Sequence, residues 1–320
     1  MDSKITKKRL YNFLEYDWIA IIASIIGAII LFSVLFSFFS VKLTPGQYFK
    51  YFYDNGVASE NDTAFYSMLK DNNTFSYDVL ELKSERLIGD NQILPARLSI
   101  QEGDAIISSL KVDEEQEYSP AYKVIKNQYY FVYDFDTILV DAINYLKTFI
   151  ADQTEKEKIS VETLESLTYD ALSKELIDNN FLTRMAKDNR FRSQAQKEEG
   201  KLLERARIEK LVNEVKNFKK IIVYNENQTE ENKIFYKPTV KVDDTEKTAN
   251  FGLKLEKLPY ENSEKKANHH VSEFFRLSGE STAKDTVLIL FNFVKQQPNL
   301  QFESISFVNE IVRQCSNILG

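Results

Sequence analysis

The sequence has few of the residues that most often build covalent, metal or redox sites. Its 320 residues include one cysteine, Cys315, and two histidines. A single cysteine excludes an intramolecular disulfide and a zinc cluster made of thiolates. Nine glycines and six prolines exclude a collagen-like chain or a glycine-rich linker architecture. The net charge of −7 argues against nucleic acid as the main partner.

One long apolar run stands near the start of the chain. Residues 18–41 carry no charge, and as a helix at about 1.5 Å per residue they outreach the roughly 30 Å hydrocarbon core of a bilayer. A secretory h-region has only about 7–15 apolar residues, and neither a small-residue cleavage site nor a lipoprotein cysteine follows here. We therefore predict a cytoplasmic tail at 1–17 and a transmembrane helix at 18–41.

Basic residues on the two flanks predict the orientation of this helix. Four basic residues precede it, whereas only Lys42 and Lys50 follow closely. The positive-inside rule places the N-terminus in the cytoplasm and the bulk of the chain outside it. The predicted localisation is thus the cell membrane, as a single-pass protein with an extracytoplasmic domain and the lipid bilayer as a partner.

Small residues gather on one side of the predicted transmembrane helix. At about 100° per residue, this side carries Ala23, Gly27, Ser33, Ser37 and Ser40. Small residues allow a second helix to approach closely, and serine hydroxyls can hydrogen-bond across the contact. The face either docks on a partner transmembrane helix or reflects the ordinary composition of a simple anchor.

The residues after the apolar run are expected to be helical. The sequence TPGQ at 44–47 has the form of a capping box, and the predicted helix runs to Asp54 with five aromatic residues near the membrane surface. A second short helix is expected at 64–70. We group 42–74 as a juxtamembrane helical segment.

Residues 75–320 are predicted to form one mixed α/β domain, because strand and helix patterns alternate along them. The expected strands are at 75–82, 105–110, 220–224, 235–242 and 285–293. The expected helices are at 138–149, within 152–180, within the charge-dense stretch 182–222, and at 302–316. In the charge-dense stretch, a spacing of three and four residues from Ile208 to Ile222 favours a solvated surface helix with one packed seam.

The motifs of common enzyme classes are missing. The sequence has no Gly-rich phosphate loop and no nucleophile elbow. His269 and His270 are adjacent, so they cannot chelate one ion together from a regular element. Asp134 and Asp136 would share one face of a strand, at a spacing that suits an inverting glycosidase, although a solvated strand face is the favoured interpretation. We therefore expect no enzyme, no cofactor and no metal.

A tyrosine cluster is the feature best suited to bind a ligand. Tyr118, Tyr122, Tyr129, Tyr130 and Tyr133 offer flat apolar faces with hydroxyl groups, which stack on sugar rings or pack at interfaces. The alternative is that most of these rings are half-buried in the core.

Three stretches resemble proteins of carbohydrate transport. RLSIQEGDAIISS (97–109) and TVLILFNFVKQQPNLQFESISFVNEIV (286–312) are similar to passages of extracytoplasmic solute-binding proteins of ABC transporters. The opening LEYDWIAII with LTPGQYFKYFY resembles uncharacterised single-pass proteins of Gram-positive bacteria encoded beside sugar ABC transporters. The resemblance implies a solute-binding-protein-like domain, transmembrane permease subunits as partners and a carbohydrate ligand. Asp104, Tyr129, Tyr130 and Tyr133 are then the candidate ligand residues.

Taken together, the sequence predicts a membrane-anchored extracytoplasmic binding or accessory subunit of an ABC transport complex, with carbohydrate as its ligand. The alternative is an interaction scaffold of a cell-envelope complex that has no pocket and uses the charged helix within 182–222 as its contact surface. An enzyme ranks third.

Overall fold

The structure is a computed structural model, and it divides the chain into two compact units, Met1–Thr44 and Pro45–Gly320. It describes residues 7, 11, 18–39, 47–54, 56–58, 62–87, 93–114, 116–186, 188–258, 274–280, 282–292 and 301–319. The first unit contains helix α2 (Trp18–Phe39), in which side chains such as Ile19 and Phe32 are more than half exposed.

The prediction of a membrane anchor needs correction. Among the residues that the structure describes, no helix combines the length and apolar character required to cross a membrane. A crossing needs about 20 consecutive apolar residues in one helix, and the longest run of α2 whose side chains are described is 21–35. A transmembrane helix at 18–41 is therefore not supported, nor is the localisation in the cell membrane with an extracytoplasmic bulk.

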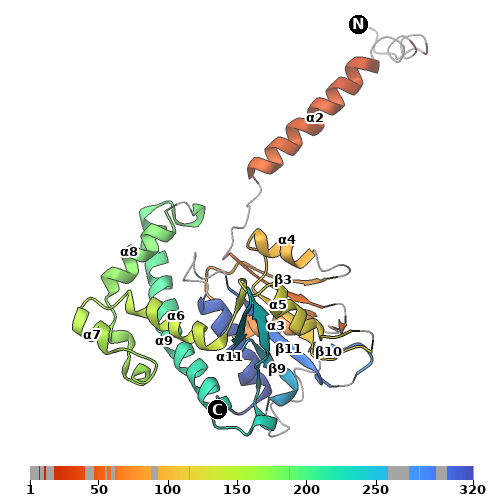
Figure 1. The fold of residues 1–320 in the computed structure, drawn as a ribbon. Helices are drawn as coiled ribbons and strands as arrows, with labels where there is room; N and C mark the ends of the chain where they lie inside the picture. Colours follow the sequence, from red (N-terminus) through yellow and green to blue (C-terminus); the bar gives the residue numbers. More distant parts are fainter. Residues whose placement is uncertain are drawn as a thin grey trace. The chain divides into compact units, whose positions relative to one another are not determined.

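The second unit is a mixed α/β domain around one sheet (Figure 1). The strand order is β3-β1-β4-β11-β9-β6, and β5 pairs with β11. β1 is parallel to both β3 and β4, whereas β11 runs antiparallel to β4, β5 and β9. The strands are β1 (Tyr48–Tyr53), β3 (Glu81–Arg86), β4 (Ala105–Ser109), β5 (Val132–Tyr133), β6 (Phe235–Tyr236), β9 (Gly252–Lys254) and β11 (Thr286–Phe291).

Helices and two small ribbons surround this sheet. The helices are α3 (Asp62–Asp71), α4 (Ile93–Ser99), α5 (Pro120–Asn127), α6 (Phe135–Lys147), α7 (Gln153–Lys158), α8 (Lys174–Arg184), α9 (Gln194–Glu226) and α11 (Gln301–Cys315). The ribbons pair β2 (Val57–Ala58) with β10 (Arg276–Leu277), and β7 (Thr239–Val242) with β8 (Thr245–Thr248). The mixed α/β class, the strands at β4 and β11, and the helices at α3, α6 and α11 agree with the sequence-based predictions.

The predicted juxtamembrane helix is instead strand β1, which lies between the parallel strands β3 and β4. Phe49 and Tyr51 point to one face of the sheet, and their ring centroids lie 4.7 and 6.0 Å from that of Phe307 in α11. Lys50 points to the other face, where its Nζ lies 2.8 Å from Glu102 Oε1. A parallel strand buried on both faces has a nearly continuous apolar sequence, which is why its aromatic residues gave no strand signal.

The charge-dense stretch forms the longest helix of the domain, α9. It starts with a capping box in which Ser193 Oγ accepts from the Gln196 N–H and the Gln196 side chain accepts from the Ser193 N–H. Its predicted seam is confirmed, because Ile208 and Phe218 are fully buried. Residues 220–224, expected as a strand, are the last turns of this helix.

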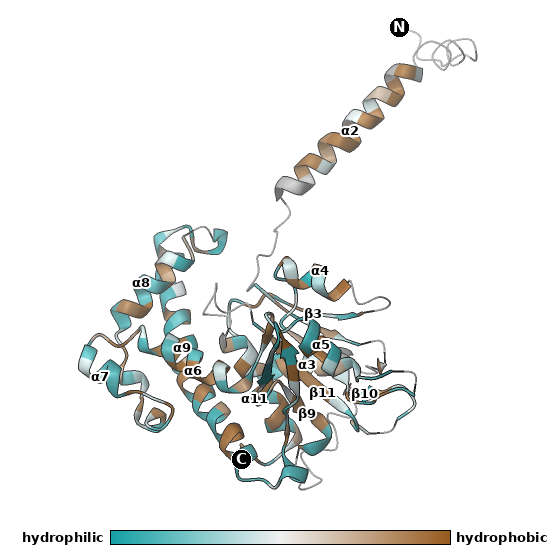
Figure 2. Ribbon diagram, in the orientation of Figure 1, coloured by the Kyte–Doolittle hydropathy of each residue, from teal (hydrophilic) through white to brown (hydrophobic). Residues whose placement is uncertain are grey.

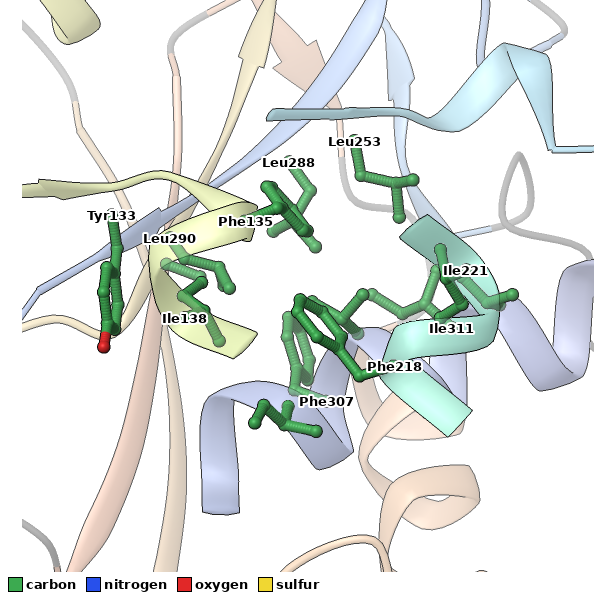
Figure 3. Close-up of a cluster of buried hydrophobic side chains, with 14 of the residues drawn as sticks. Tyr133, Phe135, Ile138, Phe218, Ile221, Leu253, Leu288, Leu290, Phe307 and Ile311 are labelled. Atoms are coloured by element: carbon green, nitrogen blue, oxygen red, sulfur yellow. The ribbon is translucent and has the colours of Figure 1, made fainter. Parts of the chain in front are cut away.

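The core joins α6, α9 and α11 to the sheet. Figure 3 shows Phe135 and Ile138 of α6 facing Leu288 and Leu290 of β11, with Phe218 of α9 beside them. The Phe135 and Phe218 rings stack at 5.7 Å between centroids. Figure 2 shows the same pattern in helices such as α9, whose ribbon alternates between brown and teal. Burial of apolar surface is thus the main stabilising term of this layer.

A network of buried charges also lies among these helices. Arg207 and Glu204, both in α9, are 3% and 0% exposed, and their charged groups lie 2.7 Å apart. Arg184 of α8 pairs with the same carboxylate at 2.7 Å, and the hydroxyl groups of Tyr77 and Tyr145 complete the contacts. Burial alone would raise the pKa of Glu204, but the two arginines outweigh it and hold that pKa at about 2.

A second buried carboxyl group, Glu303 of α11, lacks such a partner. It accepts hydrogen bonds from the Ser76 hydroxyl (2.6 Å) and the Ser76 N–H (3.3 Å). Burial raises the pKa of Glu303 to about 7, because these hydrogen bonds and the charge of Arg207 compensate only part of the lost hydration. The fold therefore favours a protonated Glu303 below neutral pH.

We expect the charge of Glu303 to make stability depend on pH. Between pH 4.5 and 7 the folded protein holds a proton that the unfolded chain has released, so the free energy of unfolding falls as pH rises. Glu303→Gln should remove about 3 kcal/mol of this fall, measured by urea denaturation across that range. The exposed Glu165→Gln serves as the control and should keep the whole fall; an unchanged fall in Glu303→Gln would contradict the assignment.

A second prediction concerns the turn before β4. Gly103 has φ +112°, and an added Cβ would lie 2.1 Å from Phe52 Cε2. We expect Gly103→Ala to lower the free energy of unfolding by about 3 kcal/mol, from backbone strain and overpacking together.

The matched control for that variant is Gly279→Ala. Gly279 also has a positive φ (+86°), but its Cβ would meet open space. Strain alone should then reduce stability by about 1 kcal/mol. Equal losses in the two variants, measured by chemical denaturation, would refute a packing role for Gly103.

Candidate functional site

The candidate site lies where the parallel strands change the direction of their connections. From β1 the chain runs through α3 to β3, on one side of the neighbouring strands β1 and β4. From β4 it runs through α5 to β5, on the other side of these two strands. In open α/β sheets, ligands bind at the carboxyl ends of the strands at such a switch point. The carboxyl ends of β1 and β4 are therefore the place to look for a site.

A cavity of about 250 Å³ occupies this edge. Small-molecule sites usually measure about 300–1,000 Å³, so this cavity is slightly below that range and suits only a small ligand. Its polar lining residues are Asp54, Gln116, Lys123, Asn127 and Gln128. Its aliphatic lining residues are Leu87, Ile93, Leu94, Ile106 and Val124, with Pro120 beside them. The lining thus comes from β1, β4, the segment after β3, α4 and α5.

Asp54 follows β1 directly and is held in place by β4. Its backbone N–H donates to the Ile107 carbonyl at 3.0 Å, and the Ser108 hydroxyl donates to its Oδ2 at 2.9 Å. Ser108 is fully buried, so this hydrogen bond is shielded from water. A carboxylate accepts about four hydrogen bonds. Asp54 is therefore an acceptor that β4 holds in a fixed position at the cavity.

Helix α5 supplies the opposite wall. It begins at Pro120, after the N-cap Ser119, whose Oγ accepts from the Tyr122 N–H at 3.2 Å. Pro120, Lys123, Val124 and Asn127 recur at helical spacing, so one face of the helix lines the cavity.

Two side chains near this helix set the polar character of the wall. The Lys123 ammonium donates to Gln116 Oε1 at 2.6 Å and keeps further donors available. Gln128 is only 8% exposed, and its side-chain amide makes no hydrogen bond to the part of the chain that the structure describes. Gln128 lines the cavity, so its side-chain amide can donate to and accept from a ligand there.

The four candidate ligand residues from the sequence lie elsewhere. Asp104 directly precedes β4, at the amino end of that strand. Its Oδ2 accepts from the Lys50 N–H at 2.7 Å, and burial raises its pKa to about 7. The Tyr129 ring packs edge-on against Tyr130, with centroids 5.6 Å apart. Tyr130 is exposed, and its hydroxyl donates to Asp243.

Tyr133 differs from the other candidates because its ring is in the core. It is 1% exposed, and its hydroxyl donates to Asp141 Oδ2 at 2.7 Å. The backbones near Asp104 and Tyr133 meet through β11, but none of the four residues lines the switch-point cavity. As ligand residues they stay a prediction.

The other singled-out residues are distributed as follows. Ala23, Gly27 and Ser33 are exposed on α2, Ser37 belongs to that helix, and Ser40 lies outside the described residues. Their role as a partner-helix face stays a prediction. His269, His270 and the capping-box residues 44–46 also lie outside the described residues.

The carboxylate pair was expected on a strand, and this is wrong. Asp134 is the N-cap of α6, where its Oδ1 accepts from the Thr137 N–H at 2.9 Å, and Asp136 stands in the first helical turn. Carboxylates at these positions stabilise a helix N-terminus. In the described ranges no group of three histidine, cysteine or acidic side chains could hold a metal ion.

The charged helix within 182–222, predicted as the contact surface of a scaffold, exposes less of its surface than expected. Helix α9 was predicted as a solvated contact surface, but one side of it packs against α6, α8 and α11. Its buried residues even include the charged Glu204 and Arg207.

Comparison with known proteins adds no identity: no family model, no curated protein and no solved structure matches this chain. Function must therefore be argued from the site.

Asp54 and Gln128 line the cavity but were not among the candidate site residues predicted from the sequence. The available signal was an aspartate directly after an apolar run, which becomes informative only once that run is assigned as a strand.

We expect Ser108→Ala to lower the free energy of unfolding by about 2 kcal/mol, because it removes a buried hydrogen bond to a carboxylate. Ser109→Ala is the matched control on the same strand; its Oγ accepts only from the Lys111 N–H at 3.0 Å, and about 1 kcal/mol is expected. Urea denaturation measures both. A smaller loss for Ser108→Ala than for Ser109→Ala would argue against a fixed Asp54.

Proposed function

We propose that the chain is a solute-binding subunit of a transport complex, which captures a small polar solute in the switch-point cavity and does not convert it chemically. The observation that carries this proposal is the preformed cavity at the switch point, which is lined by the Gln128 side chain and by Asp54, whose carboxylate accepts from Ser108. The binding groups are a carboxylate, amides and an ammonium, which recognise hydroxyl, amine and carboxylate groups.

The transport context comes from the resemblance of residues 97–109 and 286–312 to solute-binding proteins. These residues form α4, β4, β11 and α11, and β4 supplies Ile106 and Ser108 to the site. Permease subunits are the proposed partners, and carbohydrate is the ligand class that the resemblance implies. Amide and carboxylate side chains also match the hydroxyl groups of a sugar.

Binding of a solute by the full-length chain tests the site. We expect a panel of sugars and amino acids, followed by thermal shift and calorimetry, to show saturable binding of at least one compound. Gln128→Leu should weaken it about tenfold or more, because the ligand loses a hydrogen bond. Gln153→Leu, an exposed glutamine that does not line the cavity, should bind like the original chain. Absence of saturable binding, or equal affinity of the two variants, refutes the site.

Purification under mild conditions tests the transport role separately. Mass spectrometry of the affinity-purified chain should recover permease subunits in the original protein and in Gln128→Leu alike, because the variant changes the cavity only. Recovery of the chain alone contradicts the role in transport and leaves the binding result standing.

A further inference from the structure

A second and larger cavity lies in the segment that joins α6 to α8. It measures about 500 Å³, within the range of about 300–1,000 Å³ that is usual for small-molecule sites. Its lining residues, among those described, all fall within 150–173, and the Ser173 N–H closes this segment on the Phe149 carbonyl at 2.8 Å. Figure 1 shows α7, which belongs to this segment, at the far side of the helices from the sheet. The cavity is therefore distinct from the one at the switch point, with which it shares no described lining residue.

The inner part of this cavity is aliphatic. It is lined by four side chains that are each at most 8% exposed, namely Ile150, Ile159, Leu167 and Leu172. No aromatic ring belongs to the lining among the described residues, so a flat ring would find no face for stacking. An alkyl chain, in contrast, would transfer its methylene groups from water into an apolar environment.

The charged part of the lining comes from one side of α7, where Asp152, Glu155 and Lys158 recur every third residue. Glu155 and Lys158 form an ion pair at 2.6 Å. Asp152 Oδ1 instead accepts from the N–H groups of Glu155 and Thr154, at 3.0 and 2.7 Å. These hydrogen bonds lower the pKa of Asp152, so its carboxylate is charged at neutral pH. Two carboxylates and one ammonium leave this rim with a net negative charge.

The rest of the segment has the same sign of charge. Residues 150–173 carry six acidic and two basic side chains. Lys216 and Lys219 of α9 donate to the carbonyls of Glu165 and Glu162, at 3.1 and 3.4 Å, and the acidic groups still outnumber the basic ones. The field at this cavity therefore attracts a cation and repels an anion.

We infer that this cavity binds a small aliphatic ammonium ion, in which an alkyl chain ends in one positive charge. The chain would lie against the buried side chains such as Leu167 and Leu172, and the ammonium group would remain at the exposed rim beside Asp152. A single positive charge at the rim is complementary to the net negative charge there. This site goes beyond the proposed function and does not depend on the switch-point cavity.

Four probes test the ligand class by calorimetry on the full-length chain at pH 7. They are butylamine and hexylamine, which are protonated at this pH, together with neutral 1-hexanol and ionised hexanoate. We expect hexylamine to bind about tenfold more tightly than butylamine, because two more methylene groups are buried. Hexanol should bind about threefold more weakly than hexylamine, and hexanoate more weakly still, because the rim is negative.

A charge variant tests the role of Asp152. Asp152→Asn removes the charge and keeps the N-cap of α7, because asparagine caps a helix as well as aspartate does. It should weaken hexylamine about threefold and leave hexanol unchanged. Glu157→Gln, at an exposed position of α7 that does not line the cavity, is the matched control and should bind hexylamine like the original chain.

A size variant tests the location of the site. Ala171 lines the cavity and is exposed, so Ala171→Phe occupies part of the cavity without disturbing the core. It should weaken hexylamine and hexanol alike, by about tenfold or more. Ala195→Phe, at an exposed position of α9 away from the lining, should leave both affinities unchanged.

The outcomes decide the inference independently of the proposed function. Hexanoate affinity equal to that of hexylamine, or equal hexylamine affinity in Asp152→Asn and Glu157→Gln, overturns the ammonium ligand. Unchanged affinity in Ala171→Phe, or no saturable binding by the original chain, overturns the site. Gln128→Leu should bind hexylamine like the original chain, because Gln128 lines only the switch-point cavity of the two; weakening in that variant also counts against this site.

Discussion

The ion pair between Glu204 and Arg207 is the constraint on which the helical layer depends. Both groups lie on α9 in an apolar environment, and removing one of them would leave a buried charge without compensation. The pair also takes a hydrogen bond from Tyr77 and gives one to Tyr145, so α9 is tied to α6 and to the segment before β3. Because polar contacts of this kind have only one satisfactory arrangement, they fix how α9 sits on the layer more strictly than apolar packing does.

The same network reaches the sheet and through it the binding edge. Arg190 donates to the Tyr77 carbonyl at 3.0 Å, and its partner Asp188 accepts from the Gln47 side chain at 3.1 Å. Gln47 is next to the first residue of β1, and its carbonyl accepts from the Leu80 N–H just before β3. The charged layer thus sets where β1 and β3 begin. Since a strand has a fixed rise per residue, it also sets where β1 ends and Asp54 stands.

The hydrophobic periodicity of the sequence predicted those helices and strands that bury a regular set of side chains. Strand β11 could be predicted from its apolar run, and α11 from apolar residues at helical spacing, because the buried side chains of each recur regularly along the sequence. β1 was misassigned because both of its faces are buried, and residues 220–224 because packing keeps α9 helical through β-branched residues. The cavity joins residues 54, 87, 93, 94 and 106 to residues of α5 and its flanks, which only the sheet topology brings together. No window of the sequence contains that site.

The side chains of the cavity show how a binding site can be arranged before a ligand arrives. Ser108 fixes the carboxylate of Asp54 before any ligand arrives, so binding loses little side-chain entropy there. Gln128 makes no side-chain hydrogen bond to the described residues, so a ligand can bond to its amide without first breaking a contact within the protein. An aliphatic residue at this position would continue the rest of the wall, but it would offer no hydrogen bond to a polar solute. The amide therefore contributes to recognition of a solute more than to packing.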